Sequence, residues 1–279
     1  MTTDSLSGDL QEDAYSIAHT RKTADISYPS TGNDLCFQLE DKSFWFRHRN
    51  NCILEAVRKY PPNGEILDIG GGNGYVTRRL IDEGYPSVLL EPGLSGAYNG
   101  KVGRNLPHVI CGTLEDLSLS DSSISAAGCF DVIEHVEDDV KFVSEIARVF
   151  IPGGLLYTTF PAYQWLWSAC DDYSGHFRRY NIKTIDDLLG EHFNIIYYTY
   201  FFGCLTAPLL LLKSAPYHLG IIRKRPNFFS NETEHGTSGG LTASLIELML
   251  KNETKMIREG RRKTLGTSCL VVASRKSIG

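Results

Sequence analysis

A glycine-rich loop between a short apolar strand and a helix constrains this chain most. Residues 67–74 read L-D-I-G-G-G-N-G, and residues 75–81 then place apolar side chains at helical spacing with charges between them. Strand, glycine turn and helix form the first half of a βαβ unit, in which the backbone turns sharply and lies against a ligand without a Cβ in the way. The free N–H groups that open the helix point toward such a ligand. The run therefore predicts a nucleotide-cofactor loop.

The spacing of the glycines decides which cofactor suits the loop. A dinucleotide fingerprint requires G-x-G-x-x-G, and after Gly70 and Gly72 the third glycine should stand where Tyr75 is. NAD and FAD are therefore disfavoured. The pattern present is D-x-G-x-G-x-G, which resembles the first motif of the class I S-adenosylmethionine (SAM)-dependent methyltransferases, a Rossmann-like family. The resemblance implies SAM as cofactor and assigns to its binding Asp68, Gly70, Gly72 and Gly74.

Two further segments fit the cofactor half of that family. Residues 88–92 predict a second strand that ends in Glu91, 21 residues after Gly70, where a Rossmann-like fold places a carboxylate on the ribose hydroxyls. A solvated acid at a strand end is the alternative. Residues 109–116 predict the third strand and its exit loop, which in the family lies beside the adenine. Many relatives carry an acid where Thr113 stands, so this contact falls to the backbone or to Glu115. The residues assigned to the cofactor in these segments are Glu91, Pro92, Thr113 and Leu114.

A fourth strand is predicted at residues 124–130, and it is followed by D-V-I-E-H-V. This resembles the family's fourth motif, whose strand tip faces the methionine half of the cofactor, so Asp131 is assigned to the cofactor. Asp131 and Glu134 also fit a capping box that opens a helix over residues 138–150, and for Glu134 this is the favoured interpretation. His135 would lie near the cofactor, where a neutral imidazole can take a proton.

The remaining elements complete an α/β fold. A Pro-Gly-Gly turn leads into a fifth strand, residues 193–200 and 269–274 predict the sixth and seventh, and helices are predicted over residues 181–189 and 242–257. The predicted architecture is a Rossmann-like, doubly wound, seven-stranded sheet with the last strand antiparallel. Helices cover both faces, with an N-terminal helical extension and a helical lid.

The segment 161–180 is the second informative stretch, because it starts where the fifth strand ends, at the edge that binds ligands in open α/β sheets. Its sequence resembles a subgroup of bacterial methyltransferases with P-A-x-x-x-L-(W/F)-S-x-x-D-x-x-x-G-H-x-R-R-Y. The F-W-F-x-x-R-N run at residues 44–50 and the L-G-T-S run at residues 265–268 extend the match, which covers roughly residues 40–276. An ordinary surface loop is the alternative.

Candidate chemistry follows from the side chains of these stretches. His176 is a candidate general base, together with His135. Arg178 and Arg179 either hold an anionic substrate or tie down an acid, Asp171 or Asp172, and one arginine in each role is the favoured split. Residues 47–49 read as a solvated face, or they supply an arginine, Arg49, to the SAM carboxylate. The histidines and acids show no recognisable ligand spacing, so no metal is predicted.

The implied reaction is direct displacement of the methyl group by an acceptor. O-methylation of a carboxylate or hydroxyl, on a small molecule or peptide of bacterial natural-product metabolism, is favoured over N- or C-methylation. A carboxylate acceptor would need no base. The alternatives from other classes are a non-catalytic SAM-fold protein that binds partners, and an enzyme that uses SAM for another reaction.

Composition sets the remaining expectations. With 279 residues, the chain is divided into a flexible or partner-dependent N-terminal arm (1–33) and one methyltransferase domain (34–279), whose lid and substrate segments are about 40–60, 161–181 and 201–260. A net charge of -5 and a pI near 5.9 disfavour nucleic acid as partner. Seven cysteines without a C-x-x-C pair and the lack of a signal segment indicate the cytoplasm. The apolar run 201–212 is too short to span a bilayer. The arm or the apolar lid helices are candidate surfaces for a homo-oligomer.

Overall fold

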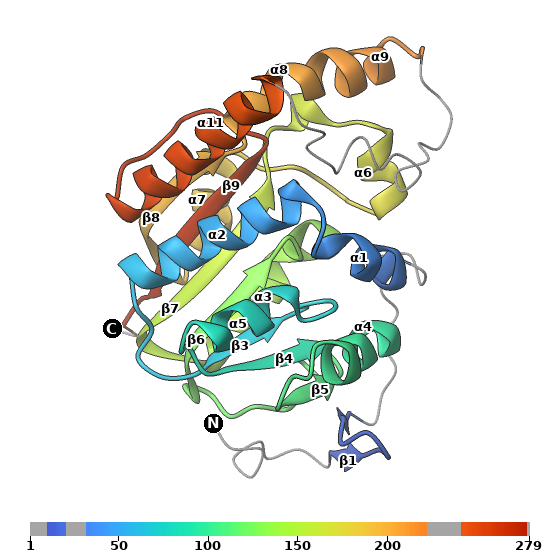
Figure 1. Cartoon of the computed structure of the whole chain (residues 1–279). Helices are drawn as coiled ribbons and strands as arrows, with labels where there is room; N and C mark the ends of the chain where they lie inside the picture. The colour runs from blue at the N-terminus through green and yellow to red at the C-terminus, as the bar shows by residue number, and fades with distance from the viewer. Residues whose placement is uncertain (1–9, 21–31, 222–240, 278–279) are drawn as a thin grey trace.

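The computed structural model describes residues 10–20, 32–221 and 241–277, and within them it holds one mixed, nine-stranded sheet flanked by helices (Figure 1). The strands are β1 (Gln11–Glu12), β2 (Ala18–His19), β3 (Ile66–Ile69), β4 (Ser87–Glu91), β5 (Val109–Cys111), β6 (Ile124–Phe130), β7 (Phe150–Pro161), β8 (Phe193–Phe201) and β9 (Ser268–Arg275).

The order of the strands is β1-β2-β5-β4-β3-β6-β7-β9-β8. Strands β5, β4, β3, β6 and β7 run parallel, whereas β9 is antiparallel to both β7 and β8. Because β4 follows on one side of β3 and β6 on the other, the chain reverses its winding at β3. Open α/β sheets bind ligands at the carboxyl ends of the strands beside such a reversal. The predicted seven-stranded sheet is confirmed by the seven strands that lie from β5 to β8 in this spatial order. Its last strand in the sequence, β9, is antiparallel as predicted.

Two more strands than predicted join the sheet, so the count is nine rather than seven. They come from the N-terminal segment: β1 pairs with β2, and β2 pairs with β5, with Ala18 opposite Ile110. Ile17 beside this pairing is 2% exposed. Each strand has only two residues, too few for a hydrophobic period to be visible in the sequence. Residues 1–9 and 21–31 of the predicted arm lie outside the described part of the chain.

The helices lie on both faces and at one end of the sheet. The α-helices are α1 (Gly32–Glu40), α2 (Phe44–Lys59), α3 (Tyr75–Asp82), α4 (Leu94–Tyr98), α5 (Asp139–Val149), α6 (Ala169–Ser174), α7 (Ile182–Leu189), α8 (Thr206–Leu209), α9 (Ala215–His218) and α11 (Leu241–Arg258). Shorter 3-10 or π turns are η2 (Asn99–Gly103), η3 (Ile133–His135), η4 (Gln164–Leu166), η5 (Gly203–Leu205) and η6 (Leu210–Ser214).

Two apolar cores hold these layers together. One core joins α5 and α7 to one face of the sheet, and it includes Ile146, Ile185 and Phe160. The other joins α2, α3 and α11 to the opposite face, and it includes Leu80 and Tyr157. Successive strand side chains point to opposite faces. The central strands are therefore mostly apolar on both faces, because both faces are covered by helices.

The predicted capping box of Asp131 and Glu134 is wrong. The helix that follows, α5, is capped by Asp138, whose side chain accepts a hydrogen bond from the Lys141 backbone N–H at 3.0 Å. Asp131 instead leaves β6 with φ +55, and η3 then turns the chain so that Glu134 is buried. The extra turn separates the strand end from the helix start, and it places Glu134 at the functional edge of the sheet.

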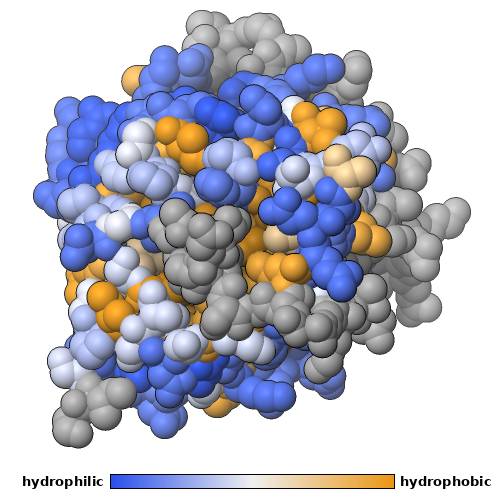
Figure 2. All heavy atoms as spheres, turned by 90° about the horizontal axis from the view of Figure 1, so that it is seen from below, coloured by the Kyte–Doolittle hydropathy of each residue, from blue (hydrophilic) through white to orange (hydrophobic). Residues whose placement is uncertain are grey.

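The predicted lid segments 161–181 and 201–260 contain α6, α8, η6, α9 and α11, which gather at one end of the molecule (Figure 1). Leu211, Leu212 and Leu219 of these segments are each more than 60% exposed. Apolar side chains also gather in the middle of the face seen from below, between hydrophilic residues (Figure 2). Among the described residues, no helix combines the length and the apolar character that a membrane crossing requires.

Candidate active site

The glycine loop between β3 and α3 has the backbone shape that its sequence predicts. Gly72 has φ +57, and a Cβ placed on it would meet nothing closer than the Asn33 side chain, at 3.8 Å. Gly74 also has a positive φ, +71, but a Cβ there would lie 2.4 Å from Leu106. L-residues with a side chain rarely adopt such backbone angles. Gly72 therefore opens onto a ligand space, whereas Gly74 allows α3 to pack closely.

A cavity of about 960 Å³ lies at this edge of the sheet. Its volume is near the upper end of the range for small-molecule sites, so it has room for a cofactor and a second small molecule. Of the residues assigned to the cofactor from sequence, only Gly74 is not in its wall. Those that line it are Arg49, Asp68, Gly70, Gly72, Glu91, Pro92, Thr113, Leu114 and Asp131.

Glu91 is a buried acid rather than a solvated one, since it is 5% exposed. One carboxylate oxygen accepts a hydrogen bond from the Gly72 N–H and the other from the Gly93 N–H, both at 2.8 Å. Burial raises the pKa of Glu91 to about 7, against the effect of these backbone hydrogen bonds. The carboxylate thus fixes the glycine loop, and its remaining lone pairs can accept ligand hydroxyl groups.

Asp68 provides an unused acceptor at the wall of the cavity. Its Oδ2 accepts a hydrogen bond from the Thr77 hydroxyl at 2.6 Å, while Oδ1 is buried and has no hydrogen-bond partner among the described residues. Burial raises the pKa of Asp68 to about 6. Because a buried polar atom without a partner is costly, a ligand with N–H groups is stabilised here.

Arg49 joins α2 to the tip of β6. Its Nε donates to Asp131 at 2.5 Å and a terminal nitrogen donates to the Phe130 carbonyl at 2.8 Å. His48 and Arg49 are buried, whereas Arg47 is exposed, so these residues do not form one solvated face. Arg49 therefore reaches the cavity already paired with a carboxylate.

Helix α1 covers the glycine loop, and the sequence analysis did not predict it. Asn73 of the loop donates to the Asn33 carbonyl at 2.8 Å and to Glu40 at 3.1 Å. Glu40 in turn pairs with Arg104 at 2.6 Å, and both side chains are less than 9% exposed. Cys36 and Leu39 of this helix line the cavity. The helical spacing of Cys36 and Leu39 is the sequence signal for α1. The apolar run is short and adjoins the polar arm, so the sequence analysis did not predict a helix there.

Residues 134–137 and 161–179 contribute the part of the cavity wall named the acceptor side, after the predicted substrate segment. Its centre is Asp171, which is 1% exposed. Its carboxylate accepts from Nε and a terminal nitrogen of Arg179, at 2.7 and 3.0 Å, and from Nδ1 of His176 at 2.9 Å. Burial opposes ionisation, but hydrogen bonds from His176 and Arg179 outweigh it and lower the pKa of Asp171. A capping box with Ser168 fixes the start of α6 in the same place. Asp171 thus anchors segment 161–181, the predicted lid segment.

The two neighbouring arginines have different positions. Arg179 lines the cavity, but it is paired with Asp171 and also donates to the Ala162 carbonyl. Arg178 is not among the cavity residues; it pairs with Asp139 of α5 at 2.7 Å and donates to the Glu137 carbonyl. Each arginine therefore has an acidic partner within the described chain.

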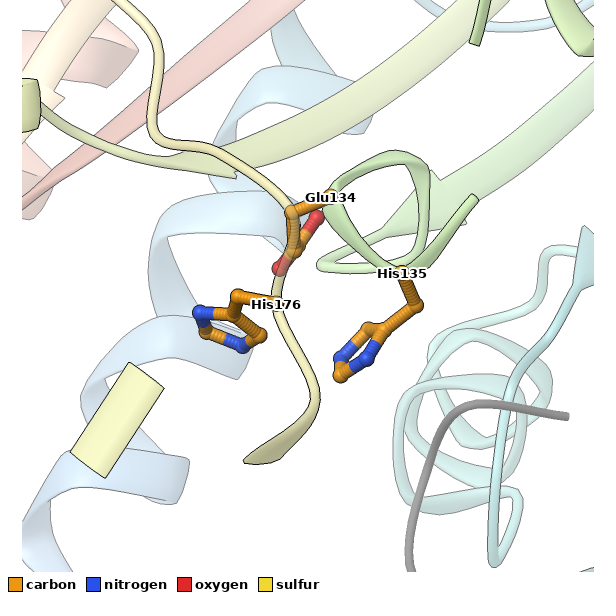
Figure 3. A group of neighbouring side chains, drawn as sticks. All are labelled: Glu134, His135 and His176. Carbon is orange, nitrogen blue, oxygen red and sulfur yellow. The ribbon is translucent and has the colours of Figure 1, made fainter. Parts of the chain in front are cut away.

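Glu134, His135 and His176 meet at the acceptor end of the cavity (Figure 3). The imidazole rings of His135 and His176 pack edge to face, with centroids 4.7 Å apart. Burial, and then His176, lower the pKa of His135 to about 4. Burial and the nearby Asp131 raise the pKa of Glu134 well above its usual range. Near neutral pH, His135 is therefore a neutral imidazole that can accept a proton.

The fold and this cavity define the chain as a Rossmann-like domain with a small-molecule cofactor site at its topological switch point. Residues 67–158 match the methyltransferase domain family. A probable SAM-dependent methyltransferase of Mycolicibacterium smegmatis is 30% identical over 142 residues, which are 48% of this chain and 51% of that protein. The chain spans about half the length of the curated relatives it matches.

Solved structures show the same fold. A Haloferax volcanii chain described as a candidate methyltransferase, in complex with the activator Trm112, aligns with a TM-score of 0.56 and 15% identity, over 90% of this chain and 95% of that one. Haemonchus contortus phosphoethanolamine N-methyltransferase 2, solved with SAM, aligns with a TM-score of 0.54 and 17% identity, over 90% and 58%. The matched family is a methyltransferase domain and the relatives are named as SAM-dependent, so SAM is the cofactor against which the cavity wall can be tested.

The residues at the cavity wall fit that cofactor. The unpartnered Oδ1 of Asp68 suits an ammonium group, Glu91 suits the ribose hydroxyls, and Gly72 leaves the space that a Cβ would fill. Thr113 and Leu114 lie in the loop after β5, next to Pro92 at the cavity wall, where they suit the adenine.

Proposed function

We propose that this chain is a SAM-dependent methyltransferase that transfers a methyl group to a hydroxyl oxygen of a small-molecule or peptide acceptor. The observation that carries the proposal is the position of His135 and His176 at the cavity that the glycine loop opens. The resemblance of residues 161–180 to bacterial methyltransferases suggests natural-product metabolism as the setting.

The pairing of the arginines favours a hydroxyl over a carboxylate acceptor. A carboxylate is best held by an arginine fork with no other acidic partner. Arg178 and Arg179 are engaged with Asp139 and Asp171, so neither offers such a fork. A hydroxyl instead needs a group that takes its proton, and the neutral imidazole of His135 meets that need.

The protein's own residues would act by position and proton transfer. When bound, SAM supplies an electrophilic methyl group: the acceptor oxygen forms the new O–C bond while the electron pair of the breaking C–S bond stays on sulfur. His135 takes the hydroxyl proton, and Asp171 orients His176 beside it through Nδ1. The apolar lid residues Leu209 and Leu212 line the cavity and help to exclude water.

The test uses SAM with a labelled methyl group and a panel of phenols, aliphatic alcohols, carboxylic acids and amines. We expect label in a hydroxyl acceptor, in a bond that resists mild base, unlike a methyl ester. The variant His135→Gln should lose transfer by about 100-fold while SAM affinity stays within about 3-fold. The exposed His108→Gln is the matched control. Transfer only to acids or amines, or full activity of His135→Gln, would contradict the proposal.

A further inference from the structure

The cluster of Glu134, His135 and His176 has the composition of a metal site. One possible ligand atom from each residue lies within 4.8 Å of the other two (Figure 3). Two imidazole nitrogens and one carboxylate oxygen are the protein ligands of many catalytic zinc sites and of non-haem iron sites. We propose that these three residues bind one divalent transition cation. This departs from the sequence-based prediction of no metal, because Glu134 and His135 are adjacent and His176 comes from a distant segment.

The buried carboxylate of Glu134 independently points to a ligand. Glu134 is 1% exposed, and its Oε2 is buried without a hydrogen-bond partner among the described residues. Its side chain faces the two imidazole rings (Figure 3). A buried oxygen without a partner costs about 1–3 kcal/mol, so proteins retain such an atom where a ligand or ion satisfies it. A cation between the carboxylate and the imidazoles would satisfy it.

The surroundings of His176 match those of a metal-bound histidine. Its Nδ1 lies 2.9 Å from the Asp171 carboxylate, which fixes this nitrogen as the N–H and directs the lone pair to Nε2. Carboxylate–histidine–metal arrangements use this same pairing to orient the ring and to increase its basicity. Arg179 compensates the charge of Asp171, so the buried carboxylate does not compete for the ion. His135 is steadied by a hydrogen bond with the backbone of Gly175.

The distances and donor types select the kind of ion. Ligand atoms on a tetrahedral zinc ion lie about 3.3 Å apart, so the three atoms need to approach by up to about 1.5 Å. Ion binding would therefore require side-chain rotations of that size in the two histidines, which are only partly buried. Mg²⁺ and Ca²⁺ favour all-oxygen sites, so the nitrogen donors favour Zn²⁺, Mn²⁺ or Fe²⁺. Three protein ligands also leave a position open toward the cavity.

The open position gives the ion a role that rests on the proposed function. An acceptor hydroxyl bound there would lose its proton to solvent more readily, because a bound cation lowers the pKa of a coordinated oxygen. The histidine lone pairs would then hold the ion instead of taking the proton. The oxygen would form the O–C bond as before, so the balance of the transfer is unchanged.

Metal binding can be measured without SAM. The full chain, free of any histidine tag and stripped with a chelator, is titrated calorimetrically with Zn²⁺, Mn²⁺ and, as a negative probe, Ca²⁺. We expect one equivalent of Zn²⁺ or Mn²⁺ to bind with micromolar or tighter affinity. Glu134→Gln and His176→Gln should each weaken this binding at least about 10-fold. Circular dichroism spectra of both variants verify that they fold. The exposed His108→Gln should bind as the wild type does.

The outcomes separate this inference from the proposed function. Absence of Zn²⁺ and Mn²⁺ binding, or unchanged binding by the Glu134 and His176 variants, overturns the metal site. Titration of the same samples with S-adenosylhomocysteine tests the cofactor site alone. Cofactor binding and methyl transfer at full rate by metal-free protein would refute the role of the ion in the transfer and leave the methyltransferase proposal intact. Metal binding without cofactor binding would support the metal site and refute the methyltransferase proposal.

Discussion

The two sides of the cavity are built in different ways. On the cofactor side, the ligand space is set by backbone: a glycine loop with positive φ, fixed by Glu91 through two N–H groups. On the acceptor side, it is set by buried side-chain ion pairs, with Asp171 as their centre. A site built from backbone depends on the φ angles of a few glycines, whereas a site built from ion pairs depends on the charges of its side chains. The comparison predicts that charge substitutions affect the acceptor side more than the cofactor side.

The largest expected effect is on the acceptor side, at Asp171. Asp171→Ala leaves Arg179 buried without its partner, which typically destabilises a protein by about 3–5 kcal/mol. The neighbouring Asp172 is a matched control, because it accepts hydrogen bonds from Trp167 and Tyr217 at the surface. Asp172→Ala should lower the unfolding free energy by less than about 1 kcal/mol. If urea unfolding shows equal losses of unfolding free energy in Asp171→Ala and Asp172→Ala, the role of Asp171 as an anchor is contradicted.

Glu253 gives the lid a dependence on pH. Burial opposes its ionisation, but hydrogen bonds from His48, Lys263 and the Phe202 and Gly203 N–H groups lower its pKa to about 2. A carboxylate with a lowered pKa stabilises the fold above its unfolded pKa, about 4.5, and this contribution disappears as the pH falls toward 2.

The substitution Glu253→Gln should therefore cost about 2–3 kcal/mol at pH 7, and the difference from wild type should shrink at pH 3. Unfolding in urea at pH 7 and pH 3 measures this difference in unfolding free energy between the variant and the wild type. Glu247→Gln on the same helix is the control, because that side chain is 63% exposed. A difference that is constant with pH would show that the Glu253 charge does not stabilise the lid.

A smaller effect is expected where a charged pair supports the cofactor side. Arg104 holds Glu40 and thereby α1 against the glycine loop. Arg104→Ala should weaken binding of S-adenosylhomocysteine about 10-fold, or about 1.4 kcal/mol, because α1 must be ordered by the ligand itself. Arg78→Ala, which breaks a surface pair with Asp82, should leave the affinity unchanged. Equal affinities of the two variants would show that α1 does not cover the cofactor.

The smallest effect is expected for Arg178. Its side chain is 30% exposed and its partner is Asp139, so Arg178→Ala should cost less than about 1 kcal/mol of stability. Arg179→Ala should cost more, because Asp171 then loses a partner in a buried site. Thermal unfolding of both variants compares them directly. If Arg178→Ala lost more stability than Arg179→Ala, then Arg178 rather than Arg179 would be the arginine that supports the fold.

The sequence was sufficient for the parallel sheet and the cofactor loop, because continuous apolar strands and positive-φ glycines are local signals. It was not sufficient for α1 or Glu253, whose partners are more distant in the chain. The capping prediction at Asp131 and Glu134 failed for a related reason. The spacing of a local cap was present, but tertiary packing buried Glu134 and left the cap to Asp138. The cluster of Glu134, His135 and His176 is visible only after folding.

The most direct test of the account is a calorimetric titration of the wild type and two glycine variants with SAM and S-adenosylhomocysteine. Gly72 and Gly84 both have positive φ and space for a side chain, but only Gly72 lines the cavity. We predict micromolar binding by the wild type and by Gly84→Arg, and a loss of at least about 100-fold, or about 2.7 kcal/mol, in Gly72→Arg. No binding by the wild type, or equal binding by both variants, would contradict a SAM site at the glycine loop.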